Sequence, residues 1–177
     1  MSMDIKQVIA TLNQMQTDGV LAQYAIGGAV GATFYLEPVS TLDVDIFVAL
    51  QTVPGTQIVT LKPIYDYLTA RGCTVDGEYI MMSGWPVQFL PPTGPLVEEA
   101  LAQAAGKDAE GLPVRVFSAE HLAAVALQTG RAKDKARLLQ FVESGVLDGP
   151  RFQDILARHR LTDRWQRFER QFLGDMP

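Results

Sequence analysis

The chain has 177 residues, enough for one domain or for one domain with a helical appendage. Hydrophobic residues make up 47% of it, which indicates a folded globular protein, and the net charge of −5 disfavours duplex nucleic acid as a partner. The single cysteine, Cys73, excludes an intramolecular disulfide and a cysteine-based zinc site. We find neither a signal-peptide pattern nor a membrane-spanning segment, so we expect a cytoplasmic protein with no membrane partner.

Helical and extended patterns alternate through the first two thirds of the chain, and the remainder is helical. In order, the sequence predicts a helix over 4–18, a strand over 21–26, a helix over 29–36, a strand containing 42–46, a helix over 61–70, strands over 78–83 and 85–90, a helix over 96–105, a strand over 112–117, and helices over 119–128, 132–143, 150–158 and 162–173. This order predicts an α/β or α+β fold with a mixed sheet and helices largely on one face. We expect a core over 1–117 and a helical C-terminal region over 118–177, packed together as one unit.

Two aspartates stand one residue apart within an apolar strand pattern, Leu42-Asp43-Val44-Asp45-Ile46. Because side chains alternate along a strand, both carboxylates leave the same face. Carboxylates so close repel each other, and a divalent cation between them removes that cost. The pattern therefore predicts that Asp43 and Asp45 share a divalent cation.

A glycine pair, Gly27-Gly28, directly follows the strand over 21–26. Such a turn lets the backbone approach a ligand closely, and a helix beginning at Ala29 would point its free N–H groups at the same place. A phosphate suits that position, and a phosphate turn facing two metal-binding carboxylates suits metal-assisted nucleotidyl transfer. The alternative is purely structural: a tight turn, and an acidic pair that only meets surface cations.

Gly27-Gly28, a helix-length spacer and Thr41-x-Asp43-x-Asp45 together resemble the active-site signature of the polymerase-beta-like nucleotidyltransferase superfamily. The likeness extends to its small bacterial branch, which is related to abortive-infection and toxin–antitoxin nucleotidyltransferases. The resemblance implies a nucleotidyltransferase core and transfer of a nucleoside monophosphate from a nucleoside triphosphate to a hydroxyl acceptor. It implies that the glycine pair binds the triphosphate, that the two aspartates bind magnesium and that Thr41 braces the loop.

A second segment resembles the C-terminal motif of the same branch, in which a helix is followed by an Arg-x-Lys-Asp turn. Here the helix begins after Ser118 and the turn is Arg131-x-Lys133-Asp134. Arg131 and Lys133 would bring positive charge to a triphosphate or to an acidic acceptor, and Asp134 would order them. The alternative for this segment is a solvated charged face at a helix start.

Three positions depart from the pattern of the relatives. Gln88 stands where they often carry a third acidic residue that acts as general base, and a glutamine cannot accept a proton. Val39 replaces an arginine two residues ahead of the threonine, and Ala126 or its neighbours replace a lysine in the helix. These departures favour an alternative function, a catalytically degenerate protein that keeps the scaffold and binds a nucleotide or a partner.

The C-terminal helices carry two further features. Trp165, Phe168 and Phe172 share one helical face, which predicts packing on the domain or on a protein partner. His121 and His159 fall on separate predicted helices, without ligand spacing to a cysteine or an acid, so we assign neither to a metal.

Overall fold

The computed structural model describes residues 5–37, 43–50 and 60–174. Val39 and Thr41 therefore lie outside the described residues. The elements in chain order are α1 (Ile5–Thr17), β1 (Gln23–Ile26), α2 (Gly28–Ala32), β2 (Val44–Ala49), α3 (Lys62–Thr69), β3 (Thr74–Asp76), β4 (Tyr79–Met82), β5 (Trp85–Leu90), α4 (Pro95–Ala102), β6 (Ala105–Ala109), β7 (Leu112–Val116), α5 (Ala119–Thr129), α6 (Ala132–Ser144), α7 (Gly149–Arg158), α8 (Thr162–Phe168) and a π-helical turn (Glu169–Leu173). Within these residues, no helix combines the length and the apolar character needed to span a membrane.

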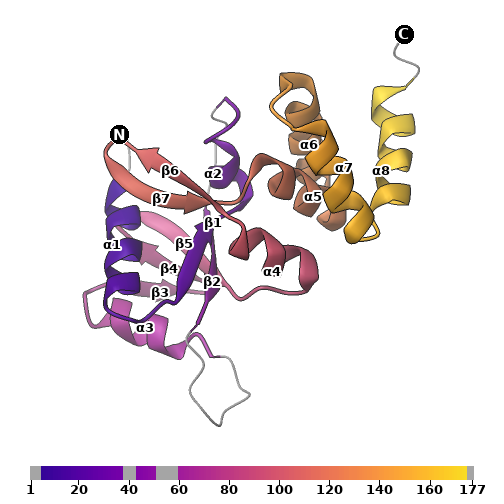
Figure 1. Ribbon diagram of the computed structural model, residues 1–177. Helices are drawn as coiled ribbons and strands as arrows, with labels where there is room; N and C mark the ends of the chain where they lie inside the picture. The colour runs from indigo at the N-terminus through magenta and orange to yellow at the C-terminus, as the bar shows by residue number, and fades with distance from the viewer. Residues whose placement is uncertain (1–4, 38–42, 51–59, 175–177) are drawn as a thin grey trace.

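The strands form one seven-stranded sheet in the order β3-β4-β5-β2-β1-β7-β6. β2 pairs in parallel with β5, and β1 pairs in parallel with β7, while the remaining neighbours are antiparallel. The predicted mixed α/β fold is thus confirmed. Figure 1 shows the sheet on one side of the molecule and helices α5 to α8 on the other, with α4 between them.

Helices cover both faces of the sheet, so the expectation of helices largely on one face was wrong. In β2 the side chains of Val44, Ile46 and Val48 are buried, whereas the intervening side chains are only partly covered. The first set packs with α1 and α3 in one apolar cluster. The opposite face packs with α4 and α5 in a second cluster, which continues into α6, α7 and α8. Because the acidic positions alternate with the buried set, they lie on this second face.

The sequence patterns missed two strands, β3 and β6. Both are edge strands with many polar or small residues, Thr-Val-Asp and Ala-Gly-Lys-Asp-Ala, and all three residues of β3 are exposed. Their hydrogen bonds to β4 and β7 hold them in the sheet, and an apolar pattern is not required at an edge. The predicted helix over 96–105 accordingly ends at Ala102.

The C-terminal helices are joined to the sheet through a shared core. That cluster runs from Ala25 in β1 through α4 and α5 to Phe168 in α8. Trp165 packs edge-on against Phe152, with ring centroids 5.0 Å apart, and stacks on Phe168. The predicted aromatic face therefore packs on the chain itself at Trp165 and Phe168, while Phe172 stays 40% exposed.

Candidate active site

The acidic strand β2 lies in the interior of the sheet, between β1 and β5. Asp45 pairs in register with Gln88 of β5. On the other side, the Asp45 carbonyl oxygen accepts a hydrogen bond of 3.0 Å from the Gly27 N–H at the end of β1. Three predicted site residues, which lie far apart in the sequence, therefore form one row across three neighbouring strands.

Asp43 and Asp45 direct their carboxyl groups to the same side, close enough to share a hydrogen bond. Burial raises the pKa of Asp45 to about 6, and the neighbouring negative charge of Asp43 adds to the rise, while Lys133 and Arg131 oppose it. Neither carboxylate forms a salt bridge with another described residue. The pair thus carries negative charge without a bonded counter-ion, which is the condition that a bound cation would relieve.

Two carboxylates alone do not complete a cation site. No group of three or more His, Cys, Asp or Glu side chains suited to hold an ion occurs among the described residues. Mg²⁺ in proteins is commonly bound by one or two carboxylates, with substrate phosphates and water as its other ligands. The pair therefore fits a magnesium ion whose remaining ligands are nucleotide phosphates and water.

The glycine turn presses directly against the acidic strand. Gly28 has a φ of +59°, and a Cβ added there would lie 2.5 Å from Oδ2 of Asp45. A Cβ at Gly27 would lie 2.6 Å from Cε2 of Phe47, whose ring stacks on Phe117. Of the two glycines, therefore, only Gly28 lies against the Asp45 carboxylate. The N–H of Gly27 is already bonded to the sheet, so its role in this structure is close packing.

The predicted basic turn lies beside the acidic pair. Arg131 is the N-cap of α6, and the charges of Asp43 and Asp45 help raise its pKa, after the larger effect of its hydrogen bond to Asp134. Lys133 is near enough to lower the pKa of Asp45. The turn is thus brought next to the acidic pair, although nearly ninety positions separate the two in the sequence.

Asp134 orders this turn. Its buried carboxylate accepts hydrogen bonds from the Arg131 backbone N–H at 3.2 Å and from Arg131 Nε at 2.7 Å, and it lies 3.6 Å from Arg137 Nη1. Burial lowers the pKa of Arg137, and the charges of Asp134, Asp45 and Asp43 oppose that change. Our sequence reasoning did not single out Arg137. The signal for it is the i, i+3 spacing from Asp134, which places both side chains on one face of α6.

We expect Asp134→Ala to destabilise the fold by about 1–2 kcal/mol, because α6 loses its cap and the half-buried Arg137 loses its partner. Urea unfolding measures this change. Asp148→Ala, which removes the N-cap of α7 from an exposed position, is the matched control and should cost about 1 kcal/mol. If Asp134→Ala loses no more stability than Asp148→Ala, that result would contradict the role of Asp134 in ordering the turn.

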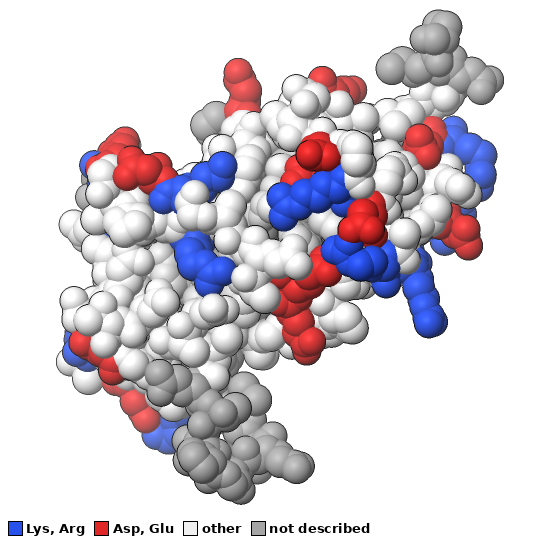
Figure 2. All heavy atoms as spheres, viewed as in Figure 1, with Lys and Arg blue, Asp and Glu red and all other residues white. Residues whose placement is uncertain are grey.

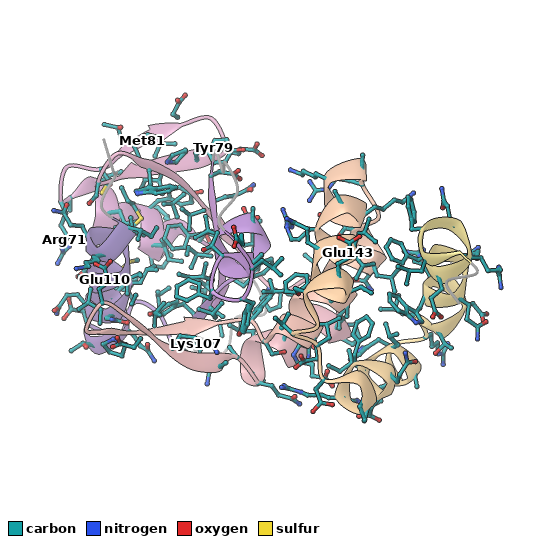
Figure 3. The ribbon with its side chains drawn as sticks, turned by 90° about the horizontal axis from the view of Figure 1, so that it is seen from above. Arg71, Tyr79, Met81, Lys107, Glu110 and Glu143 are labelled. Atoms are coloured by element: carbon teal, nitrogen blue, oxygen red, sulfur yellow. The ribbon has the colours of Figure 1, made fainter. Side chains whose placement is uncertain are left out.

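Gln88 also contacts a residue that the sequence patterns did not single out. Its Nε2 donates a hydrogen bond of 3.3 Å to Oε2 of Glu78, at the tip of the hairpin between β3 and β4. The pKa of the adjacent Tyr79 is raised, chiefly by the charge of Asp43 and by its hydrogen bond to Glu78. Figure 3 shows Tyr79 and Lys107 on opposite sides of the sheet, so this hairpin lies away from β6 and β7.

The two histidines meet at one glutamate, which their sequence spacing did not suggest. His121 Nε2 lies 2.8 Å and His159 Nε2 lies 3.2 Å from Oε2 of Glu99, and Arg158 binds its other oxygen. Burial alone would raise the pKa of Glu99, but hydrogen bonds from His121 and Arg158, together with the nearby His159 ring, hold it at about 2. This cluster ties α4 to α5 and α7. It belongs to the packing of the helical region.

A search of solved structures finds chains of the same architecture at low sequence identity. An antigenic nucleotidyltransferase-like protein from Paracoccidioides brasiliensis matches with a TM-score of 0.62 and 14% identity, over 94% of this chain and 92% of that chain. The solution structure of the antibiotic-resistance factor ANT(2'')-Ia matches with a TM-score of 0.55 and 15% identity, over 96% and 98% of the two chains. The crystal structure of ANT(2'')-Ia with adenylyl-2''-tobramycin matches with a TM-score of 0.53 and 16% identity, over 88% and 94%.

No family model matches the sequence, and the curated proteins yield no match. At 14–16% identity, the structural likeness shows the fold alone. The chain therefore has a nucleotidyltransferase-like fold, as its glycine and aspartate motifs predicted. The abortive-infection and toxin–antitoxin branch stays a prediction from those motifs.

Proposed function

We propose that this protein is a magnesium-dependent nucleotidyltransferase that moves a nucleoside monophosphate from a nucleoside triphosphate to a hydroxyl acceptor. The observation that carries the proposal is the meeting of opposite charges at one place. Asp43 and Asp45 face the basic turn of Arg131 and Lys133, and neither carboxylate has a salt-bridge partner among the described residues. A site for a metal ion together with a polyphosphate requires both: acidic groups bind the metal ion, and basic groups bind the polyphosphate.

Each group has a distinct role in this reaction. Asp43 and Asp45 would hold Mg²⁺ or Mn²⁺, which neutralises charge on the phosphate oxygens when bound. Arg131 and Lys133 would hold the polyphosphate chain, and Asp134 keeps Arg131 in position. Gly28 allows the turn to lie against the Asp45 carboxylate. The acceptor oxygen attacks the α-phosphorus, and pyrophosphate leaves with the electron pair of the broken bond.

The position of Gln88 favours a second candidate, a degenerate protein that binds a nucleotide or a protein partner without turnover. Gln88 lies beside Asp45, where a carboxylate would serve as base. Adenylyl-2''-tobramycin is bound by ANT(2'')-Ia, and for this chain we propose that the acceptor bears a hydroxyl. We further propose a cytoplasmic location and, for the degenerate alternative, a protein partner. A toxin–antitoxin setting is proposed as an extension of the sequence resemblance.

The surface argues against a long nucleic-acid acceptor. Figure 2 shows acidic and basic side chains interspersed over the helical region, with no continuous basic field on this face. The net charge of −5 points the same way, because binding to a phosphate backbone depends on clustered Lys and Arg. We therefore favour a small molecule or a protein side chain as the acceptor.

Calorimetric titration of the four nucleoside triphosphates with Mg²⁺ tests the proposal. We expect the wild type to bind at least one of them and the Asp43→Asn/Asp45→Asn double variant to bind none. A double variant of two exposed aspartates, Asp66→Asn/Asp163→Asn, removes equal charge elsewhere and should bind as the wild type does. Binding that survives both the site variant and a chelator would contradict the metal site. Binding without pyrophosphate release from any nucleotide would favour the degenerate protein.

A further inference from the structure

Transfer to a hydroxyl needs a group that accepts the hydroxyl proton. Asp43 and Asp45 are the candidate cation ligands, and an amide at Gln88 cannot accept a proton. Tyr79 is excluded as well, because a phenol, with an ordinary pKa of about 10, is protonated at neutral pH. The base must therefore come from a carboxylate close to this row that has no role in holding the cation.

The hairpin between β3 and β4 supplies such a carboxylate. Asp76 pairs with Tyr79, so Gly77 and Glu78 form a two-residue turn in which Gly77 has a φ of +63°. A two-residue hairpin turn with glycine at a positive φ in its first position puts Glu78 at the hairpin tip, and the Glu78 side chain is exposed. The register of β4 on β5, with Ile80 opposite Val87, brings the tip to the level of Gln88.

The contact between the two side chains has a definite polarity. Gln88 Nε2 donates a hydrogen bond to Glu78 Oε2 at 3.3 Å, and the phenol of the neighbouring Tyr79 also hydrogen-bonds to the Glu78 carboxylate. Gln88 in turn stands in register with Asp45. Gln88 thus holds the Glu78 carboxylate on the side of β5 that faces away from β2. That carboxylate lies farther from Asp45 than one at position 88 would.

We propose that Glu78, held by Gln88, is the general base of this site and supplies the proton-accepting carboxylate that β5 lacks. This inference rests on the proposed function. Gln88 is then a positioning residue, because its amide orients Glu78 and does not touch the reacting atoms. In this protein the base then lies on the hairpin and not on β5, so turnover does not require an acidic residue at position 88.

The proton balance of the step is simple. As the acceptor oxygen forms its bond to the α-phosphorus, its proton passes to the Glu78 carboxylate. The bond from the α-phosphorus to the bridging oxygen breaks, and the electron pair leaves with pyrophosphate. Glu78 then releases the proton to water, which reaches it freely because the hairpin tip is exposed.

The test is pyrophosphate release from a nucleoside triphosphate with Mg²⁺ present, with water or a simple alcohol as the acceptor. We expect Glu78→Gln to lower kcat by about 10²-fold or more and to leave the dissociation constant of the nucleotide unchanged. Glutamine at this position still pairs with Gln88, so a merely structural role would leave kcat unchanged as well. The exchange variant Glu78→Gln/Gln88→Glu keeps one amide and one carboxylate in contact and should recover much of the lost rate.

Asp76→Asn removes a charge from the same hairpin, two residues away, and serves as the control that should keep the wild-type rate. A Glu78→Gln variant with the wild-type kcat overturns the assignment of the base and leaves the proposed function standing. A wild type that binds nucleotide and releases no pyrophosphate overturns both. Pyrophosphate release by the wild type therefore distinguishes a failure of the base assignment from a failure of the proposed function.

Discussion

Asp45→Asn is expected to make the metal-free protein more stable at neutral pH by about 2 kcal/mol, while it abolishes magnesium-dependent nucleotide binding. Burial and the charge of Asp43 raise the pKa of Asp45 from 3.8 to about 6, so its ionised form is unfavourable in the folded state. Each pKa unit corresponds to about 1.4 kcal/mol, and asparagine removes the charge that causes this cost. Most substitutions destabilise, so an increase would mark a residue kept for function.

The pH dependence follows from the direction of the shift. Because the pKa of Asp45 is higher in the folded state than in the unfolded state, the folded state binds the extra proton between about pH 4 and pH 6. The wild type therefore loses this contribution as the pH rises through 6, and the variant does not. Thermal unfolding with a chelator present should show the variant melting about 4–8 °C higher at pH 8 and by a smaller margin at pH 5.

Asp66→Asn, at an exposed position in α3, is the control for this measurement and should show no such gain. Magnesium and nucleotide should narrow the difference between the wild type and Asp45→Asn, because only the wild type binds them. A variant that is equally stable or less stable at pH 8 would show that Asp45 is well accommodated in the fold. That result would count against the proposal that the acidic pair binds a cation.

Gly28→Ala is expected to weaken magnesium-dependent nucleotide binding by about a hundredfold, with a loss of stability of only about 1 kcal/mol. Alanine at φ +59° costs roughly 1 kcal/mol. Its Cβ would lie 2.5 Å from Asp45 Oδ2, and the flexible carboxylate, not the backbone, would move away. A displacement of about 1 Å in a positioned group can reduce the function of a site by two orders of magnitude.

Gly145→Ala separates the two effects. Gly145 has a φ of +70°, and a Cβ there meets no atom within 4 Å, so the variant carries the backbone strain without a contact to the site. It should lose similar stability in urea unfolding and keep full nucleotide binding in calorimetry. Equal binding by Gly28→Ala and Gly145→Ala would mean that the position of the Asp45 carboxylate is not critical.

Local patterns predicted the parts of this fold that local physics controls. The apolar periodicity marked α1, α3, α5, α6 and α7 within one residue at each end, and the predicted helix over 162–173 is α8 followed by the π-helical turn. The alternation through Leu42 to Ile46 put Asp43 and Asp45 on one face. The glycine pair leads from β1 into α2, with Gly27 as the N-cap of the helix, and the φ of +59° at Gly28 is a backbone requirement that the residue type itself reveals. The edge strands β3 and β6 were missed, because they are held by a neighbour's hydrogen bonds.

The sequence by itself determined which chemical groups this protein has: a glycine pair, two aspartates on one strand face, and a basic turn with an aspartate three residues after its first arginine. Only the tertiary structure decided which of them meet. The sheet order places β5 beside β2 and so sets Gln88 against Asp45. Helix packing brings Arg131 to the acidic pair, and hairpin register brings Glu78 to Gln88. These contacts join distant segments through strand pairing and shared apolar burial, and no local pattern encodes such pairings.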